Sequence, residues 1–278
     1  MDNSYLNIIT FLLTTLFYYV VLKPTPTFDP DNDKQMESKQ RSNMFLAIYL
    51  LLVILIQFIV NASIITTTCG GNIGENMGAA GLFTFIPWIL IFGVLLLILI
   101  AYPGFKSAFS DVIGYYYVSN SATKILGQLL ISPEIQETID KSQISADEKH
   151  NMETTAQAII KIFGNNAILI NQIVPSNFVN YWNILTPLKN TAYKDETKED
   201  TQKIKKELFE LVVKRDNIGE AMWYIYTGLL VTSVVQLKLT TRGCNSNPKT
   251  MEDNYQKFLK EEKQSKINID KTKTTYKL

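Results

Sequence analysis

The sequence predicts an all-α fold, a multi-span helical membrane protein with a small helical soluble domain between spans three and four. Three observations predict it. Residues 44–102 form two long uncharged apolar limbs joined by a glycine-rich connection, and shorter uncharged stretches occupy residues 6–22 and 221–237. Residues 103–220 instead have the composition of a domain in water and the periodicity of amphipathic helices.

The limbs 44–65 and 80–102 are the strongest evidence, and they predict a transmembrane hairpin made of spans two and three. Leu, Ile, Val and Phe make up 15 of 22 residues in the first limb and 15 of 23 in the second. At roughly 0.3–0.6 kcal/mol for each of these residues, a limb gains on the order of 5–9 kcal/mol on insertion, which outweighs the cost of Gln57 and Asn61. These two amides lie one helical turn apart, so we expect them to form interhelical polar contacts.

The connection between the limbs, residues 66–79, contains Cys69 and four glycines. Phosphate-binding loops are also rich in glycine, but here no lysine follows and a span rather than a strand precedes. A tight turn is therefore the favoured interpretation. Inside the second limb, Pro87 predicts a kink.

The first apolar stretch, residues 6–22, has the length of a signal-peptide core. No Lys or Arg precedes it, however, and Lys23 and Pro24 follow where cleavage would require small residues. We therefore predict a retained first span, at the short end of what crosses a bilayer. Residues 23–43 follow as a polar loop whose three prolines oppose helix formation.

The soluble domain, residues 103–220, carries three helix signals. Ser132 precedes a proline and an acid, as at a helix start. Residues 145–148 form a capping box that opens a helix closed by Gly164. Residues 197–215 place Ile204 and Leu208 on one apolar stripe. We expect a small helical domain that rests against the membrane.

Residues 221–237, which have an aromatic-rich start and are followed by Lys238, fit a fourth span, with a half-buried helix as the alternative. The basic tail, 238–278, is predicted to hold a short helix capped by Thr250 and Asp253 and to be disordered after about Lys266. Its charge would suit an anionic surface, and a simple solvated tail is the alternative. Aromatic residues near span ends are candidate interfacial anchors; these are Tyr5, Tyr18, Tyr19, Tyr102, Phe105, Trp223, Tyr224 and Tyr226.

The distribution of basic residues predicts the topology. Lys and Arg number zero before span one, four between spans one and two, and zero in the connection. This pattern places the amino terminus and the connection on the translocated side, and loop 23–43 and the soluble domain in the cytoplasm. Cys69 and Cys244 then emerge on the same lumenal face, where a disulfide would clamp the hairpin to the last span. Two free thiols are the alternative.

The sequence contains no catalytic or metal-binding signature. One histidine and two cysteines are too few for a metal centre built from those ligands, and His150 lies on the polar side of its predicted helix. Only Asp111 and Glu220 offer acids beside the spans, and no ionisable group lies within one, which argues against membrane-embedded hydrolysis and against transport. We expect no enzyme activity and no cofactor.

Two stretches carry a further signal: YPGFKSAFSDVIGY at 102–115, and WYIYTGLL at 223–230, which leads to GCNS at 243–246 and to Met251. Together they resemble a multi-span membrane protein of the nucleocytoplasmic large DNA viruses. In that resemblance the first stretch follows the third span, and the second enters the last span and ends at a single cysteine. Phe105 stands where the pattern favours tryptophan.

The resemblance implies a virion membrane protein or minor capsid component in the membrane beneath an icosahedral capsid. It implies as partners the lipid bilayer, capsid or other virion membrane proteins, and further copies of the chain, with host endoplasmic-reticulum-derived membrane as the assembly site. We expect no nucleic-acid partner. The alternatives are a small channel or transporter, and an assembly factor of the endoplasmic reticulum that is left out of the particle.

Overall fold

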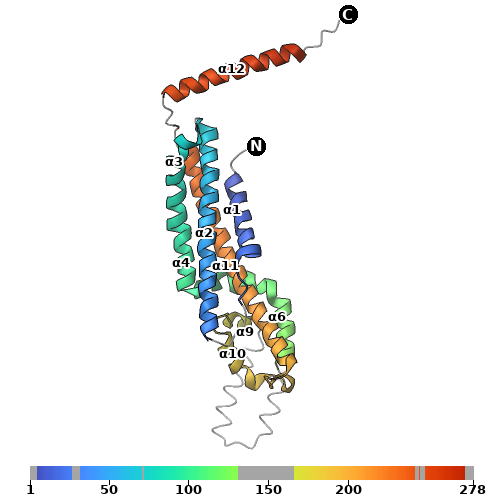
Figure 1. Cartoon of the computed structure of the whole chain (residues 1–278). Helices are drawn as coiled ribbons and strands as arrows, with labels where there is room; N and C mark the ends of the chain where they lie inside the picture. The colour runs from blue at the N-terminus through green and yellow to red at the C-terminus, as the bar shows by residue number, and fades with distance from the viewer. Residues whose placement is uncertain are drawn as a thin grey trace, which may run out of the picture. The chain divides into compact units, whose positions relative to one another are not determined.

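A computed structural model describes residues 5–26, 32–70, 72–130, 166–241, 244 and 248–272. Throughout these ranges the chain forms helices and no strand, with one isolated bridge between Leu130 and Lys189 (Figure 1). The all-α prediction is confirmed for these ranges. The helices predicted near Ser132 and from Ser145 to Gly164, with His150, lie outside the described residues.

The chain divides into two compact units. Unit 1 comprises Met1–Val21, Ala47–Val94 and Thr227–Leu278, and unit 2 comprises Leu22–Leu46 and Leu95–Tyr226. Among the described residues, three helices are long and apolar enough to cross a membrane, Ser38–Cys69, Ile73–Ala101 and Glu199–Thr241. Length and composition thus support spans two, three and four. Leu6–Leu22 is a shorter apolar helix, and its crossing stays a prediction.

Helix α2 (Asn32–Cys69) is one continuous helix of 38 residues, about 57 Å long at 1.5 Å per residue. Its start corrects the prediction that residues 23–43 form a loop, because residues 32–43 are helical. All three prolines of that segment precede Asn32, and the Gln, Glu, Lys and Arg residues that follow are good helix formers.

The turn after α2 is shorter than the predicted connection 66–79. Gly70, with φ of 74°, leaves the helix, and α3 (Ile73–Pro87) already begins three residues later. The Asn72 side chain accepts a hydrogen bond from the Glu75 backbone N–H at 3.0 Å and donates to the Glu75 carboxylate at 3.1 Å. This reciprocal cap starts α3 early, so two of the four glycines lie inside a helix.

Pro87 is followed at once by a π-helical segment, Trp88–Gly93, and then by α4 (Val94–Ala101). Proline supplies no backbone N–H, so a local change in hydrogen-bond pattern is the expected response. The predicted disturbance of this limb therefore takes the form of a wide turn within a continuous run of helix.

Aromatic side chains form the core of unit 1. Phe11 of α1 (Leu6–Phe17) lies 5.3 Å from Trp88 and 5.8 Å from Phe92, measured between ring centroids. Tyr49 of α2 lies 6.1 Å from Phe92 and stacks on Tyr18 at 4.4 Å. Gly228 of α11 (Glu199–Thr241) lies so close to the Phe11 ring that a Cβ there would collide with it.

Unit 2 has a separate core beneath α6 (Tyr115–Leu129), α9 (Asn166–Gln172), α10 (Phe178–Ile184) and the first part of α11. Ile204 and Leu208 are buried in it, as the predicted stripe requires. Helix α11 then continues without a break through the predicted fourth span, a run of 43 residues that the sequence had divided in two.

Helix α12 (Pro248–Thr272) has 25 residues. The prediction of a short helix and of disorder after Lys266 is therefore wrong as far as Thr272. The cause is local: the chain has neither glycine nor proline between residues 249 and 272, and pairs such as Glu262 with Lys266, at 2.7 Å, support an isolated helix.

Candidate functional site

The segment after α4 changes helix type four times within a few residues. Tyr102 leaves helical geometry with φ of −127° and ψ of 74°, and a 3₁₀ turn, Pro103–Lys106, follows. Short α5 (Ser107–Phe109) and a π-helical segment, Ser110–Gly114, then lead into α6. This is the first of the two stretches that carry the viral resemblance, and in unit 2 it packs against α11.

Four charged side chains meet where the apolar stretches end, and we call them the junction cluster: Lys23, Lys106, Asp216 and Glu220. Glu220 pairs with Lys23 at 2.5 Å and with Lys106 at 2.8 Å, and Lys106 also reaches Asp216 at 2.9 Å. Each of the four side chains is only 10–16% exposed. Two ammonium groups thus neutralise two carboxylates inside a largely buried cluster.

The electrostatics of the cluster follow from its geometry. Burial by itself would raise the pKa of Glu220, but the ammonium groups of Lys23 and Lys106 outweigh it and lower that pKa to about 2. Burial would likewise lower the pKa of Lys106, but the carboxylates of Glu220 and Asp216 outweigh it and raise the pKa. Glu220 is therefore ionised at any physiological pH, and so is Lys106.

Two glycines bring the backbones at the junction into contact. A Cβ at Gly219 would lie 2.6 Å from the Cβ of Ser110, and one at Gly114 would lie 2.6 Å from the carbonyl oxygen of Arg215. Both distances are shorter than real Cβ contacts, so only glycine fits at either position. The π-helical segment therefore lies directly on α11.

A buried arginine fastens the neighbouring turn of α11 to two other segments. Arg215 is fully buried and donates to the backbone oxygen of Ile170 and, at 3.2 Å, to the side chain of Asn171. Asp111 lies 3.9 Å from the guanidinium, and its backbone oxygen accepts from Asn171 at 3.1 Å. The guanidinium thus binds a backbone carbonyl as well as a carboxylate, which ties α9 and the π-helical segment to α11.

Aromatic contacts complete the junction. Trp223 donates its indole N–H to the backbone oxygen of Phe105 at 2.9 Å, and its ring packs edge-on against Phe109 at 5.0 Å. The ring of Tyr226 lies 6.3 Å from the ring of Phe109, measured between centroids. The two stretches that carry the resemblance thus contact each other in unit 2.

The predicted interfacial anchors differ in exposure, and two of them, Tyr19 and Trp223, are half-buried. Tyr5, Tyr102, Phe105 and Tyr226 are more than half exposed, as an anchor in the head-group region must be. Tyr18 and Tyr224 are buried, so for these two the prediction is wrong. Tyr18 stacks on Tyr49 in the unit 1 core. In a sequence, an aromatic residue near a span end looks the same whether it packs in the core or anchors the helix at the interface.

The two amides inside the second span form interhelical contacts in unit 1, as their spacing predicts. Gln57 donates to the backbone oxygen of Asn7 at 3.0 Å and to Thr10 at 3.1 Å. Asn61 donates to Thr84 at 2.8 Å and accepts from Asn7 at 3.0 Å. Asn7 also donates to Gln236 of α11 at 3.2 Å. This buried chain of amides and hydroxyls links α1, α2, α3 and α11.

Cys69 and Cys244 form a disulfide with a Cα–Cα distance of 5.2 Å across 175 residues of sequence. It joins the last residue of α2 to the segment that follows α11. Of the two alternatives left open by the sequence, the structure contains the bridge. The clamp lies within unit 1.

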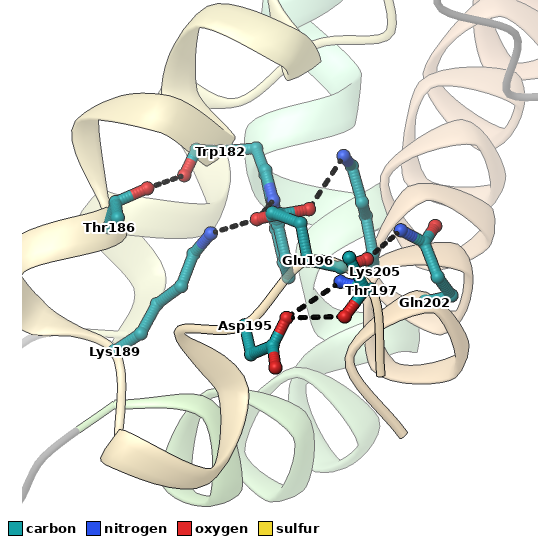
Figure 2. Close-up of polar contacts among 8 residues, drawn as sticks. All are labelled: Trp182, Thr186, Lys189, Asp195, Glu196, Thr197, Gln202 and Lys205. Atoms are coloured by element: carbon teal, nitrogen blue, oxygen red, sulfur yellow. Dashed lines mark hydrogen bonds and ion pairs between the residues drawn. The ribbon is translucent and has the colours of Figure 1, made fainter. Parts of the chain in front are cut away.

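A second polar cluster in unit 2 surrounds Glu196 (Figure 2). The carboxylate accepts from the Trp182 indole at 2.7 Å and from Lys189 and Lys205 at 3.0 and 3.2 Å. Lys189 is fully buried, with its ammonium 3.7 Å from the centre of the Trp182 ring. Burial lowers the pKa of Lys189. Burial would raise the pKa of Glu196, but the hydrogen bonds that Glu196 accepts outweigh this effect and lower the pKa of Glu196. The cluster closes the loop between α10 and α11 onto the core.

Sequence reasoning missed most of the junction cluster. It singled out Asp111 and Glu220 as the acids beside the spans, but not Lys23, Lys106 or Asp216. A signal was present, because each charge lies within a few residues of an uncharged stretch and the signs balance. In the part of the chain that the structure describes, no three His, Cys, Asp or Glu residues are grouped as metal ligands.

Compared with protein-family models, curated proteins and solved structures, the chain matches none.

Proposed function

We propose that the protein is a structural membrane protein of a large DNA virus particle, which anchors or shapes the internal membrane beneath the capsid. The observation that carries the proposal is the junction. There, the two stretches that carry the viral resemblance contact each other through Trp223 and Phe105, next to a cluster whose charges satisfy one another. In chain order, Lys23 follows the first apolar stretch, Lys106 follows the third and Glu220 precedes the fourth.

This arrangement suits mechanical anchorage. A charge beside a bilayer is costly unless it is paired, and removing one partner of a buried ion pair strongly destabilises the folded protein. Lys23, Lys106 and Glu220, which flank three apolar stretches, are therefore held together by ion pairs that share Glu220. A cluster of this kind would stabilise unit 2, whose helical part would present a surface to capsid or other virion membrane proteins, with no catalytic role.

The test is mass spectrometry of purified virions, after washing with high salt or with mild detergent. The proposal expects the protein in the particle, retained through salt and released only by detergent. Release by salt alone would contradict membrane anchorage. Presence in infected-cell endoplasmic reticulum but not in particles would instead support an assembly factor.

A small channel is the second candidate, and the buried chain of amides in unit 1 favours it. Asn7, Asn61 and Gln236 place polar atoms inside an otherwise apolar helix bundle. Ion flux through liposomes that contain the purified protein would support this candidate, and liposomes that stay tight would leave the structural role.

A further inference from the structure

Helix α12 has an amphipathic pattern with exposed apolar side chains. Tyr255 and Phe258 are 56% and 61% exposed, and the half-buried Leu259 lies beside them on one stripe of the helix. Apart from Met251, Ile267 and Ile269, the rest of the helix is mostly polar, with six lysines and five acids among its 25 residues. Such a helix is too polar to span a bilayer, and its aromatic stripe is of a kind that prefers to be covered.

The disulfide fixes where this helix begins. Cys244 is bonded to Cys69, the last residue of α2, whose sequence is uncharged after Arg41. Pro248 follows Cys244 by four residues, so at about 3.8 Å per Cα step it lies within about 15 Å of the bridge. The first turn of α12 is thus held close to the end of a candidate span, whatever direction the helix takes from there.

We propose that α12 is an interfacial helix that lies in the membrane surface, with Tyr255, Phe258 and Leu259 at the boundary between head groups and acyl chains. Tyrosine and phenylalanine suit this depth, and lysines on the other faces, such as Lys257 and Lys260, reach the head groups. One turn and two turns further along the stripe's own face, Glu262 and Lys266 pair with each other at 2.7 Å, which marks the end of the stripe. Because lysines exceed acids by only one, burial of the stripe rather than net charge holds the helix. This site is separate from the junction and does not depend on a role in virions.

The test uses the full-length protein in phosphatidylcholine nanodiscs, with a photo-crosslinking residue at one position. Phe258→p-benzoylphenylalanine places the probe on the stripe, and the same replacement at Gln264, which is exposed on the opposite face, is the matched control. After irradiation, mass spectrometry of the α12 peptide counts lipid adducts. We expect at least about fivefold more lipid adducts from position 258, because an interfacial helix buries one face about 5–10 Å deep.

Two further arms sharpen the test. Adding 0.5 M salt should leave the ratio of adducts unchanged, and adding Tyr255→Ser to the probe at 258 should lower the lipid yield severalfold. Equal lipid yields at the two positions, or adducts at 258 mainly to protein, would overturn the proposal, and protein adducts would point to a second copy as the cover. Helicity and the intact disulfide, measured on each variant, show that the fold is retained.

Discussion

Replacing Glu220 by glutamine tests whether the junction cluster holds the protein together. Glutamine keeps the shape of the side chain but removes the charge that Lys23 and Lys106 share. Lys106 keeps Asp216 as a partner at 2.9 Å. For Lys23, the ion pair with Glu220 at 2.5 Å is lost while the lysine stays about nine-tenths buried.

Removing one partner of a buried ion pair costs about 3–5 kcal/mol. The stabilisation of the Glu220 carboxylate also depends on pH, because its pKa falls from 4.5 to about 2, whereas burial lowers the pKa of Lys23 despite the charge of Glu220. Because the folded-state pKa is the lower one, this stability is present above pH 4.5 and is lost as the pH falls toward 2. Glu220→Gln should therefore lower the stability near pH 7 and flatten its acid dependence.

The assay is thermal unfolding in mild detergent at several pH values, followed by tryptophan fluorescence. Glu210→Gln is the matched control, because Glu210 lies on the same helix but is 64% exposed and faces Lys206 at 3.9 Å, a pair worth less than about 0.5 kcal/mol. Adding Lys23→Met to Glu220→Gln should recover part of the loss, since the buried ammonium that no longer faces the Glu220 charge is then gone. If Glu220→Gln and Glu210→Gln unfold at the same temperature, the junction cluster does not stabilise the fold and the prediction is refuted.

Three more perturbations follow from the packing. Cys69→Ser should remove a cross-link worth about 2–5 kcal/mol, and non-reducing peptide maps of the wild type should join the two cysteine peptides. Gly228→Ala should cost about 1–3 kcal/mol by forcing the ring of Phe11 aside, whereas Gly127→Ala, where a Cβ meets nothing within 4 Å, should be neutral or stabilising in the same melt. Glu196→Ala should destabilise more than Lys189→Met, because the first leaves a buried ammonium without its carboxylate and the second leaves a half-exposed carboxylate with Lys205; similar melting points would contradict this.

The length of the uncharged stretches was enough to predict the spans, but the helix boundaries between them were harder to predict from helix propensity. A stretch such as 44–65 is interpreted by adding many similar small terms, so one misjudged residue changes little. The start of α2 at Asn32 depends instead on where three prolines stop, and the start of α3 at Ile73 depends on one cap made by Asn72 and Glu75. Boundaries set by one or two residues are the ones that the sequence misplaced.

The junction could be predicted only in part, since it brings together residues far apart in the sequence. Lys23 and Glu220 are 197 residues apart, and Lys106 and Asp216 are 110 apart. Gln57 and Asn61 were predictable as interhelical contacts from their place in a span, but their partners on α1 were not, because Asn7 and Thr10 resemble ordinary polar residues at a span end. Packing selects such partners, and a single sequence does not display it.

A substitution at Asn7 distinguishes the proposed structural role from the proposed channel. Within the described part of the chain its Oδ1 is buried without a hydrogen-bond partner, while its Nδ2 donates to Asn61 and Gln236. Asn7→Leu removes that unsatisfied acceptor but leaves both Asn61 Oδ1 and Gln236 Oε1 without the Asn7 donor, so stability should fall by about 1–3 kcal/mol. In a scaffold, folding and particle incorporation would then continue. In a channel, an unsatisfied oxygen inside the bundle is where a permeating water or ion would bind, so the same variant should abolish flux in liposomes while the protein remains folded. A variant that still folds but loses flux would therefore overturn the structural role, whereas unchanged incorporation into particles would support it.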